Sequence, residues 1–324
     1  MNWRLPTTTY CSAFALACAM PGGAGAQPYP SKPVRFIVPY AAGGATDIIT
    51  RVVAPRVAEG LGQQLIVDNR PGAGAIIGTS ALAKSAPDGY TIMMAEIAHG
   101  ANPALRSKLP YDTAKDFTAV TLVALLPTIL VVHPSLPVKS VKQLIALGKA
   151  RPGQLSYSSS GIGSANFLAA ELFKNETGMD VVHIPYQGGG QAILSVISGE
   201  AQMLFVTVPP ALPHVKSGKV RVLAVTGSKR IAALPDVPTI VEAGMPSFEV
   251  YLWVGVLAPA GTPEAIITRL NGEIVRVLAI AEVRERISGL GAEVVGSTPQ
   301  ELTRYINAEI ARWSKAIKPG MRVD

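Results

Sequence analysis

The chain has 324 residues, of which 48% are hydrophobic and 16% are charged. This composition supports a large buried core and excludes a disordered chain, and the length suits two domains better than one. The formal charge is +7, but the lysines and arginines are scattered and no run resembles a nucleic-acid-binding arm. We therefore expect no nucleic-acid partner and only a mild attraction for anions.

The N-terminus has the pattern of a secretory signal peptide. Arg4 supplies the positive start, residues 10–20 form an apolar run too short to span a bilayer, and Ala24-Gly25-Ala26 is a small-residue cleavage site. We predict that residues 1–26 are removed by cleavage after Ala26. No later stretch is long and apolar enough for a membrane helix, so we expect an exported, soluble protein.

Both cysteines, Cys11 and Cys18, lie inside this predicted signal peptide. The mature protein would then have no thiol, no disulfide and no thiolate metal site. Lipidation at Cys18 is an alternative, although Ala15 stands where lipidation motifs usually carry leucine.

From residue 29 on, short strands alternate with helices. The first series is predicted as strand 34–39, helix 46–61, strand 65–69, helix 76–86 and strand 91–95. Pro55 should bend or divide the first helix. Strands and helices at this spacing are typical of a parallel sheet with helices on its faces. The segment 96–109 is predicted as a loop.

Two long apolar runs, residues 119–132 and 249–259, are the candidates for crossings between two domains. Between them a second series is predicted: helix 141–150, strand 155–158, helix 164–177, strand 181–185, helix 191–198 and strands 203–208 and 220–225. After the second run, a helix starts at Pro263, and another follows the capping box of Thr298 and Glu301. The predicted domains are 27–126 with 249–324, and 127–248.

Small-residue loops lie where parallel strands would end, and two of them suit an anion. Residues 40–47 place Gly43 and Gly44 before a helix, and residues 158–164 place serines and glycines before another helix. Free N–H groups and the positive end of the helix dipole favour an anion at such a point. Loops 70–75 and 186–190 can join them in one crevice. Asp47 either caps its helix or faces the crevice, where it would favour a ligand that also carries an ammonium or hydroxyl group.

Sequence signatures of enzymes and of metal sites are missing. The chain has none of the common hydrolase, nucleotide-binding or zinc-protease motifs, and its four histidines show no metal spacing. We expect no catalysis and no cofactor.

Many short motifs together resemble the Bug (TctC-type) solute-binding receptors of tripartite tricarboxylate transporters. The resemblance covers essentially all of the mature chain. It rests on residues 30–35, 38–47, 69–74, 87–91, 99–103, 109–112, 158–164, 184–190, 234–239, 242–244 and 258–263.

The resemblance implies an α/β fold of the second periplasmic-binding-protein type, with two domains that close on a small carboxylate. It implies a monomer in the periplasm that delivers its ligand to membrane permease subunits. It also implies binding by backbone groups of a first clamp loop (residues 40–47) and a second clamp loop (residues 159–164), with further residues around them. The predicted ligand-binding residues are Tyr40, Ala41, Ala42, Gly43, Gly44, Thr46, Asp47, His99, Asn102, Ser159, Ser160, Gly161, Ile162, Gly163, Ser164, Phe167, Tyr186, Gly188, Gly189 and Thr207.

Two departures from the family pattern bear on the ligand. Phe167 stands where the family often has histidine, and Val206-Thr207 stands where it often has a polar or acidic pair. They suggest a less polar pocket and an apolar or aromatic carboxylate. Two other functions remain open: an exported α/β hydrolase acting on carboxylate esters, and a ligand-sensing partner of a signalling receptor.

Overall fold

The computed structural model describes residues 1, 3, 29–186, 188–246, 248–318 and 321–323. Most of the predicted signal peptide, including Cys11, Cys18 and the cleavage site at Ala26, lies outside these residues, as does Gln187 of the loop 186–190. In the part of the chain that is described, no helix is both long enough and apolar enough to span a bilayer.

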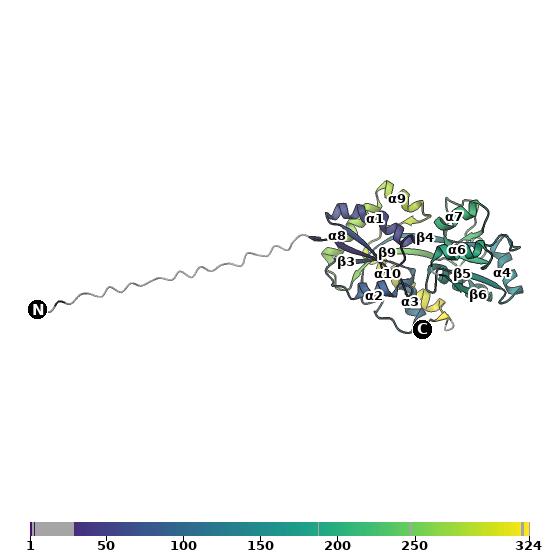
Figure 1. Ribbon diagram of the computed structural model, residues 1–324, viewed down its shortest axis with the longest axis horizontal. Helices are drawn as coiled ribbons and strands as arrows, with labels where there is room; N and C mark the ends of the chain where they lie inside the picture. The colour runs from purple at the N-terminus through teal and green to yellow at the C-terminus, as the bar shows by residue number, and fades with distance from the viewer. Residues whose placement is uncertain (2, 4–28, 187, 247, 319–320, 324) are drawn as a thin grey trace.

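One continuous sheet runs through two lobes (Figure 1), with the strand order β2-β1-β3-β9-β4-β7-β5-β6 and with β8 and β10 paired to β4. The pairs of β1 with β2 and β3, and of β5 with β6 and β7, are parallel, as the alternation of strands and helices predicts. The strands are β1 (Val34–Val38), β2 (Leu65–Asn69), β3 (Thr91–Glu96), β4 (Phe117–Val132), β5 (Leu155–Ser159), β6 (Val181–Pro185), β7 (Met203–Thr207), β8 (Arg221–Val225), β9 (Tyr251–Pro259) and β10 (Glu293–Val294).

The long apolar run before residue 132 is a single strand, β4, that changes partners along its length. Residues 117–127 pair antiparallel with β9, whereas residues 128–132 pair antiparallel with β7 and β8. Pro127 stands where the partner changes. β4 therefore belongs to the sheet of both lobes. The predicted domain boundaries at 126/127 and 248/249 stay predictions.

Helices cover both faces of this sheet (Figure 1). They are α1 (Ala45–Leu61), α2 (Ile76–Ala83), α3 (Ile97–Leu105), α4 (Val141–Ala150), α5 (Ala165–Thr177), α6 (Gly189–Ile197), α7 (Val208–Lys216), α8 (Glu264–Leu278), α9 (Ala281–Ser288) and α10 (Pro299–Ala316). The capping box predicted at Thr298 and Glu301 is present at the start of α10. Pro55 lies inside α1 without dividing it.

Three helices, α3, α7 and α9, lie where the sequence does not predict them. The segment predicted as a loop over 96–109 contains α3, and the strand predicted over 203–208 ends at Thr207, after which α7 begins. Pro103 is inside α3, and Pro209, Pro210 and Pro213 are in α7. Proline weakens the helical pattern of a sequence, but α3 is held by packing against α10, where Gly100 lies against Glu309.

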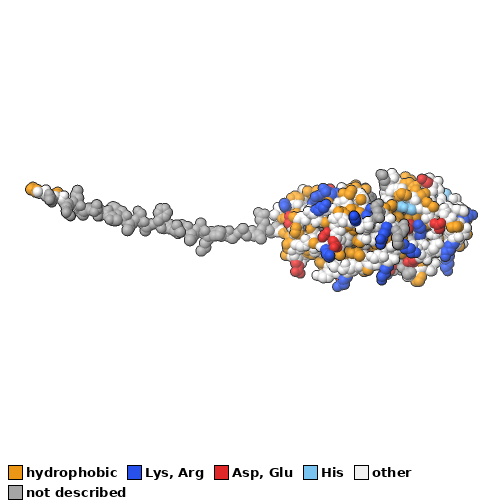
Figure 2. Space-filling view, turned by 90° about the horizontal axis from the view of Figure 1, so that it is seen from below, with side chains coloured by type: hydrophobic (Ala, Val, Ile, Leu, Met, Phe, Trp, Pro, Cys, Tyr) orange, Lys and Arg blue, Asp and Glu red, His pale blue; other side chains and the backbone are white. Residues whose placement is uncertain are grey.

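The core has two parts. A large cluster extends through both lobes and includes the buried rings of Trp253 and Trp313, while a smaller one lies in the second lobe under α6 and α7. On the face drawn in Figure 2, the lysines and arginines are distributed over both lobes and not gathered into one patch.

Candidate functional site

The first clamp loop is shaped by glycine and by its own aspartate. Gly43 has φ of +81°, which favours glycine, and Gly44 is the N-cap of α1. The Gly43 N–H donates to Asp47 Oδ2 at 2.9 Å. Ala41, Ala42, Gly43 and Gly44 are exposed, so the start of α1 is open to a ligand.

Asp47 holds this loop in place and does not lie free beside an anion. Its carboxylate accepts hydrogen bonds from Arg51 Nε at 3.0 Å and from Asn69 Nδ2 at 2.9 Å, and the residue is 2% exposed. Burial raises the pKa of Asp47, but the hydrogen bonds from Arg51, from the Gly43 N–H and from Asn69 outweigh it and lower the pKa below its ordinary value. The capping alternative for Asp47 is therefore the one this geometry favours.

Replacing Asp47 by asparagine should destabilise the protein by about 2 kcal/mol at pH 7, because Arg51 and the Gly43 N–H lose a charged acceptor. A carboxyl group with a lowered pKa stabilises the fold above its unfolded pKa and loses this effect as pH falls through its folded pKa. The difference between D47N and the wild type should therefore shrink at acid pH. Urea unfolding at pH 3.5 and pH 7 checks this.

The control is Glu282→Gln, because Glu282 and its partner Arg56 are both exposed and such pairs contribute little. A D47N protein as stable as E282Q at pH 7 would contradict the role of Asp47.

The second clamp loop connects β5 to α5. Ser164 caps α5 by accepting from the Phe167 N–H at 3.3 Å, and its hydroxyl donates to the Gly161 carbonyl at 2.6 Å. The Ser159 hydroxyl lies 2.7 Å from His183 Nε2 and accepts from the Gly161 N–H at 3.1 Å. These bonds fix a tight turn at the positive end of a helix.

A neighbouring loop lies beside the second clamp loop. The Tyr186 N–H donates to the Ser159 carbonyl at 3.0 Å, and a Cβ built on Gly189 would lie 3.7 Å from Ser160 Oγ. Gly188 is the N-cap of α6. Asn166, which is not among the residues predicted from the sequence, accepts a hydrogen bond from the Ser160 hydroxyl at 2.5 Å. Loops predicted from separate motifs thus form one surface.

The second clamp loop contacts the first lobe. A Cβ built on Gly163 would lie 3.6 Å from Asn102 Oδ1, 3.6 Å from Leu105 Cδ1 and 3.9 Å from Gly74 Cα. A Cβ built on Gly74 would lie 3.3 Å from the Ile162 carbonyl oxygen. Asn102 Nδ2 in turn donates to the Gly74 carbonyl at 2.9 Å. Residues 162–163 of one lobe therefore lie next to the loop 70–75 and helix α3 of the other.

Besides Asn102 of α3, three predicted site residues are not in these loops. Phe167 is 5% exposed and packs its ring 5.0 Å from that of His183, while His99 is 3% exposed and packs its ring 4.9 Å from that of Phe117. Burial lowers the pKa of His99 to about 4, so its imidazole is neutral at pH 7. Thr207 is the N-cap of α7 and half-buried. Whether these three bind a ligand stays a prediction.

A buried carboxyl group that no sequence motif singles out lies under the first clamp loop. Glu96, at the end of β3, is 6% exposed and accepts a hydrogen bond from the Thr46 hydroxyl at 2.5 Å. The Tyr40 hydroxyl lies beside it. Burial raises the pKa of Glu96 to about 7, although these two hydroxyls counteract the rise. Its position directly after a predicted strand is the sequence signal that could have identified Glu96, because the carboxyl ends of parallel strands face the crevice.

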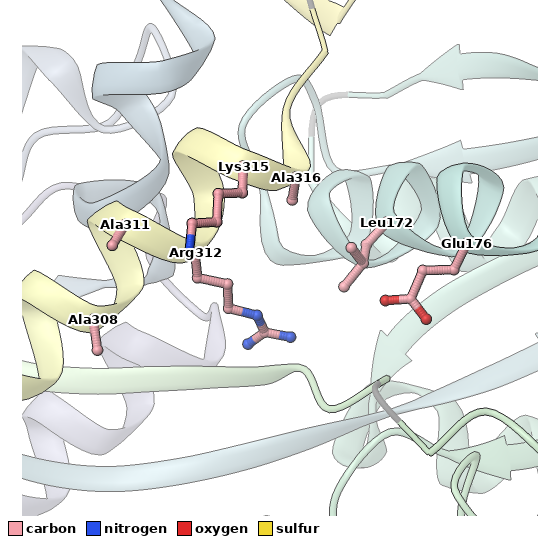
Figure 3. A pocket seen from close by; sticks show the side chains of 7 residues that line it. All are labelled: Leu172, Glu176, Ala308, Ala311, Arg312, Lys315 and Ala316. Carbon is pink, nitrogen blue, oxygen red and sulfur yellow. The ribbon is translucent and has the colours of Figure 1, made fainter.

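Two cavities lie away from the clamp loops. A groove of about 580 Å³ lies between α5 and α10, where Arg312 extends from α10 towards Leu172 and Glu176 of α5 (Figure 3). A second cavity of about 350 Å³ lies in the second lobe and is lined by residues of α4, β8 and the segment 236–243. Neither includes a predicted ligand-binding residue.

Comparison with known proteins identifies relatives along nearly the whole chain. The family model of the tripartite tricarboxylate transporter family receptor, TctC, matches residues 49–320. Protein BugT of Bordetella pertussis is 39% identical over 297 residues, which are 90% of each chain.

Two solved structures from Rhodopseudomonas palustris have the same fold. Rpa4515 with adipate has a TM-score of 0.82 and 38% identity, covering 89% of this chain and 97% of its own. MatC with bound malate has a TM-score of 0.82 and 33% identity, covering 90% of this chain and 100% of its own. The predicted two-domain periplasmic-binding-protein fold is thereby confirmed, and the chain belongs to the TctC family of tripartite tricarboxylate transporter receptors.

Proposed function

We propose that this protein is a periplasmic receptor that captures a small carboxylate between its two lobes and delivers it to the permease subunits of a tripartite tricarboxylate transporter. The observation that carries the proposal is the close approach of Gly163 to Asn102 and Gly74, which both lie within 4 Å of a Cβ built on Gly163. This approach places the start of α5, in one lobe, against the lobe that carries the start of α1. Closure of the two lobes on an anion requires such an arrangement.

The carboxylate class is supported by both clamp loops and by relatives. Each loop precedes a helix, α1 or α5, and presents backbone N–H groups at the positive end of its dipole. Rpa4515 was solved with adipate and MatC with malate, which are both carboxylates. We therefore retain the ligand-binding residues predicted from the sequence, and the domains 27–126 with 249–324 and 127–248, as part of this proposal.

The hypothesis of an apolar ligand receives less support. Val206 is 1% exposed and belongs to the core of the second lobe, and Phe167 faces His183. Side chains buried in this way give little apolar surface to a ligand. We propose a carboxylate without restricting it to aromatic acids.

The proposed export to the periplasm is supported by the family and by the signal peptide predicted from the sequence. Transport requires the permease, so we expect uptake of the ligand by cells to need both this protein and its permease subunits. Normal uptake without this protein would favour the role of a ligand sensor.

One observation favours the alternative of a hydrolase, namely the Ser159 hydroxyl 2.7 Å from His183 Nε2. Three features oppose it. Ser159 is 0% exposed, its oxygen accepts the Gly161 N–H, and no carboxylate among the described residues is hydrogen-bonded to His183. A serine nucleophile needs access to substrate and an oriented base. The pair therefore fits a structural role in the second clamp loop.

A thermal-shift screen over mono-, di- and tricarboxylates should identify at least one acid that stabilises the mature protein. A ligand at about 100 times its Kd adds about 2.7 kcal/mol to the free energy of unfolding. Calorimetry then gives Kd and stoichiometry, and an assay with carboxylate esters in parallel should show no turnover. Sustained ester hydrolysis, or the absence of any shift over the whole panel, would reject the proposal.

A further inference from the structure

A side-chain amide links two helices of different lobes. Helix α5 packs against β5 and β7 in the second lobe, whereas α10 packs against α3 in the first. Asn175, near the end of α5, donates through Nδ2 to the carbonyl of Ala316, the last residue of α10, at 3.0 Å. The same nitrogen lies 3.2 Å from the sulfur of Met321. The lobes are therefore connected here as well as by β4, the strand that runs through both.

The carbonyl of Ala316 needs this donor. Ala316 ends α10, and the last carbonyls of a helix have no partner inside it. Because a carbonyl only accepts hydrogen bonds, the NH2 group of Asn175 and not its oxygen faces Ala316. The bond lies beside the groove that Leu172 and Ala316 help to line (Figure 3). Packing between α5 and α10 is incomplete at this groove, so a single hydrogen bond can influence the separation of the two helices.

Helix α5 meets the first lobe near both of its ends. Its start carries the second clamp loop, where Gly163 lies next to Gly74 and Leu105. Asn175 is near its other end, about 15 Å further along the helix axis than Ala165. A helix of this length moves as a rigid element, so a shift at Asn175 is transmitted to the second clamp loop.

We propose that Asn175 is a positioning residue for ligand capture: its bond to Ala316 holds α5, and with it the second clamp loop, close to the first lobe. The inference rests on the proposed function, because its consequence for affinity requires a ligand that binds between the lobes. Loss of one neutral hydrogen bond shifts an equilibrium between two arrangements of the lobes by about 2- to 10-fold. A ligand that binds the closed arrangement then binds more weakly by up to the same factor.

The test is Asn175→Ala, which removes the amide and suits a helix. Spin labels on Ile77→Cys in α2 and Leu194→Cys in α6 report the separation of the lobes, because both side chains are exposed and the two helices belong to different lobes. Cys11 and Cys18 precede residue 27, so the mature protein offers only the two introduced thiols.

Without added acid, pulsed electron paramagnetic resonance should give a longer and broader distance distribution for N175A than for the labelled parent protein. Calorimetry on the unlabelled proteins uses the acid of the carboxylate panel that binds the wild type most tightly. Its Kd should be about 2- to 10-fold higher for N175A.

The matched control is Asn271→Ala. Asn271 is also helical, in α8, and its Nδ2 donates to the carbonyls of Val120 at 2.9 Å and Ser297 at 2.8 Å, both in the first lobe. N271A should lower the free energy of unfolding at least as much as N175A, yet leave the label distances and the Kd unchanged.

Equal label distances in N175A and the parent protein, an equal change in N271A, or an unchanged Kd in N175A would overturn the role of Asn175 and leave the proposed function standing. Failure of every acid of the panel to bind the wild type would overturn the proposed function, and with it the role of Asn175 in capture, whatever the label distances.

Discussion

Replacing Gly163 by valine will lower ligand affinity at least about 100-fold while both lobes keep their fold. Gly163 has φ of +83° and is buried against Asn102, Leu105 and Gly74 of the opposite lobe. A Cβ would already be in van der Waals contact with these atoms, so we expect the two additional methyl groups of valine to crowd them. The lobes would then be held apart, so a ligand that binds the closed state would bind with lower affinity. Calorimetry measures the change, and circular dichroism checks the fold.

The matched control is Gly178→Val. Gly178 has φ of +68°, ends helix α5, and has no atom within 4 Å of a Cβ built on it. Both variants therefore carry the strain of valine in a left-handed conformation, about 1–2 kcal/mol, but only G163V obstructs the contact between the lobes. If G178V weakens binding as much as G163V, general destabilisation is the cause and the contact is not needed for binding.

Local patterns predicted most elements of this fold because their signals lie within a few residues. The capping box of Thr298 and Glu301, the strand before Gly43 and the helix after it, and the turn before Ser164 are each defined by short spacings. The two clamp loops follow from the same kind of signal. Their relation to the crevice follows from the direction of parallel strands.

Elements that depend on tertiary packing were less predictable. Helices α3 and α7 carry prolines that weaken a helical pattern, yet α3 is held between α10 and the sheet. β4 looked too long for a strand because one run of residues serves two sheet regions, with Pro127 where the partner changes. A pattern within one segment carries no information on its partners.

The polar cluster of the candidate site shows the same limit. Glu96 and Thr46 are 50 residues apart in the sequence, and Ser159 and His183 are 24 apart. Each residue alone has a common structural role, and only the fold brings them together. Conversely, Asp47 looked as if it could face a ligand, but Arg51 and Asn69 engage its carboxylate.

Replacing Glu96 by glutamine will stabilise the protein by about 3 kcal/mol at pH 8 and leave its stability unchanged at pH 4. Burial raises the pKa of Glu96 from 4.5 to about 7. Between these values the folded state binds a proton that the unfolded state has released, so wild-type stability falls as pH rises through this window. A shift of this size corresponds to about 3 kcal/mol above pH 7. Glutamine has no charge to lose, and its amide oxygen can still accept the hydrogen bond from Thr46.

Glu171→Gln is the contrasting variant, because it also removes a buried acid but one with a cationic partner. Glu171 is 5% exposed and accepts hydrogen bonds from Lys174 at 2.9 Å and from the Tyr157 hydroxyl at 2.5 Å. Its replacement should destabilise the protein at pH 8 by about 1–3 kcal/mol, since Lys174 loses its acceptor. Denaturant unfolding at pH 4, 6 and 8 separates the two cases. An E96Q protein that is less stable than wild type at pH 8 would mean that Glu96 is held as an anion by its surroundings.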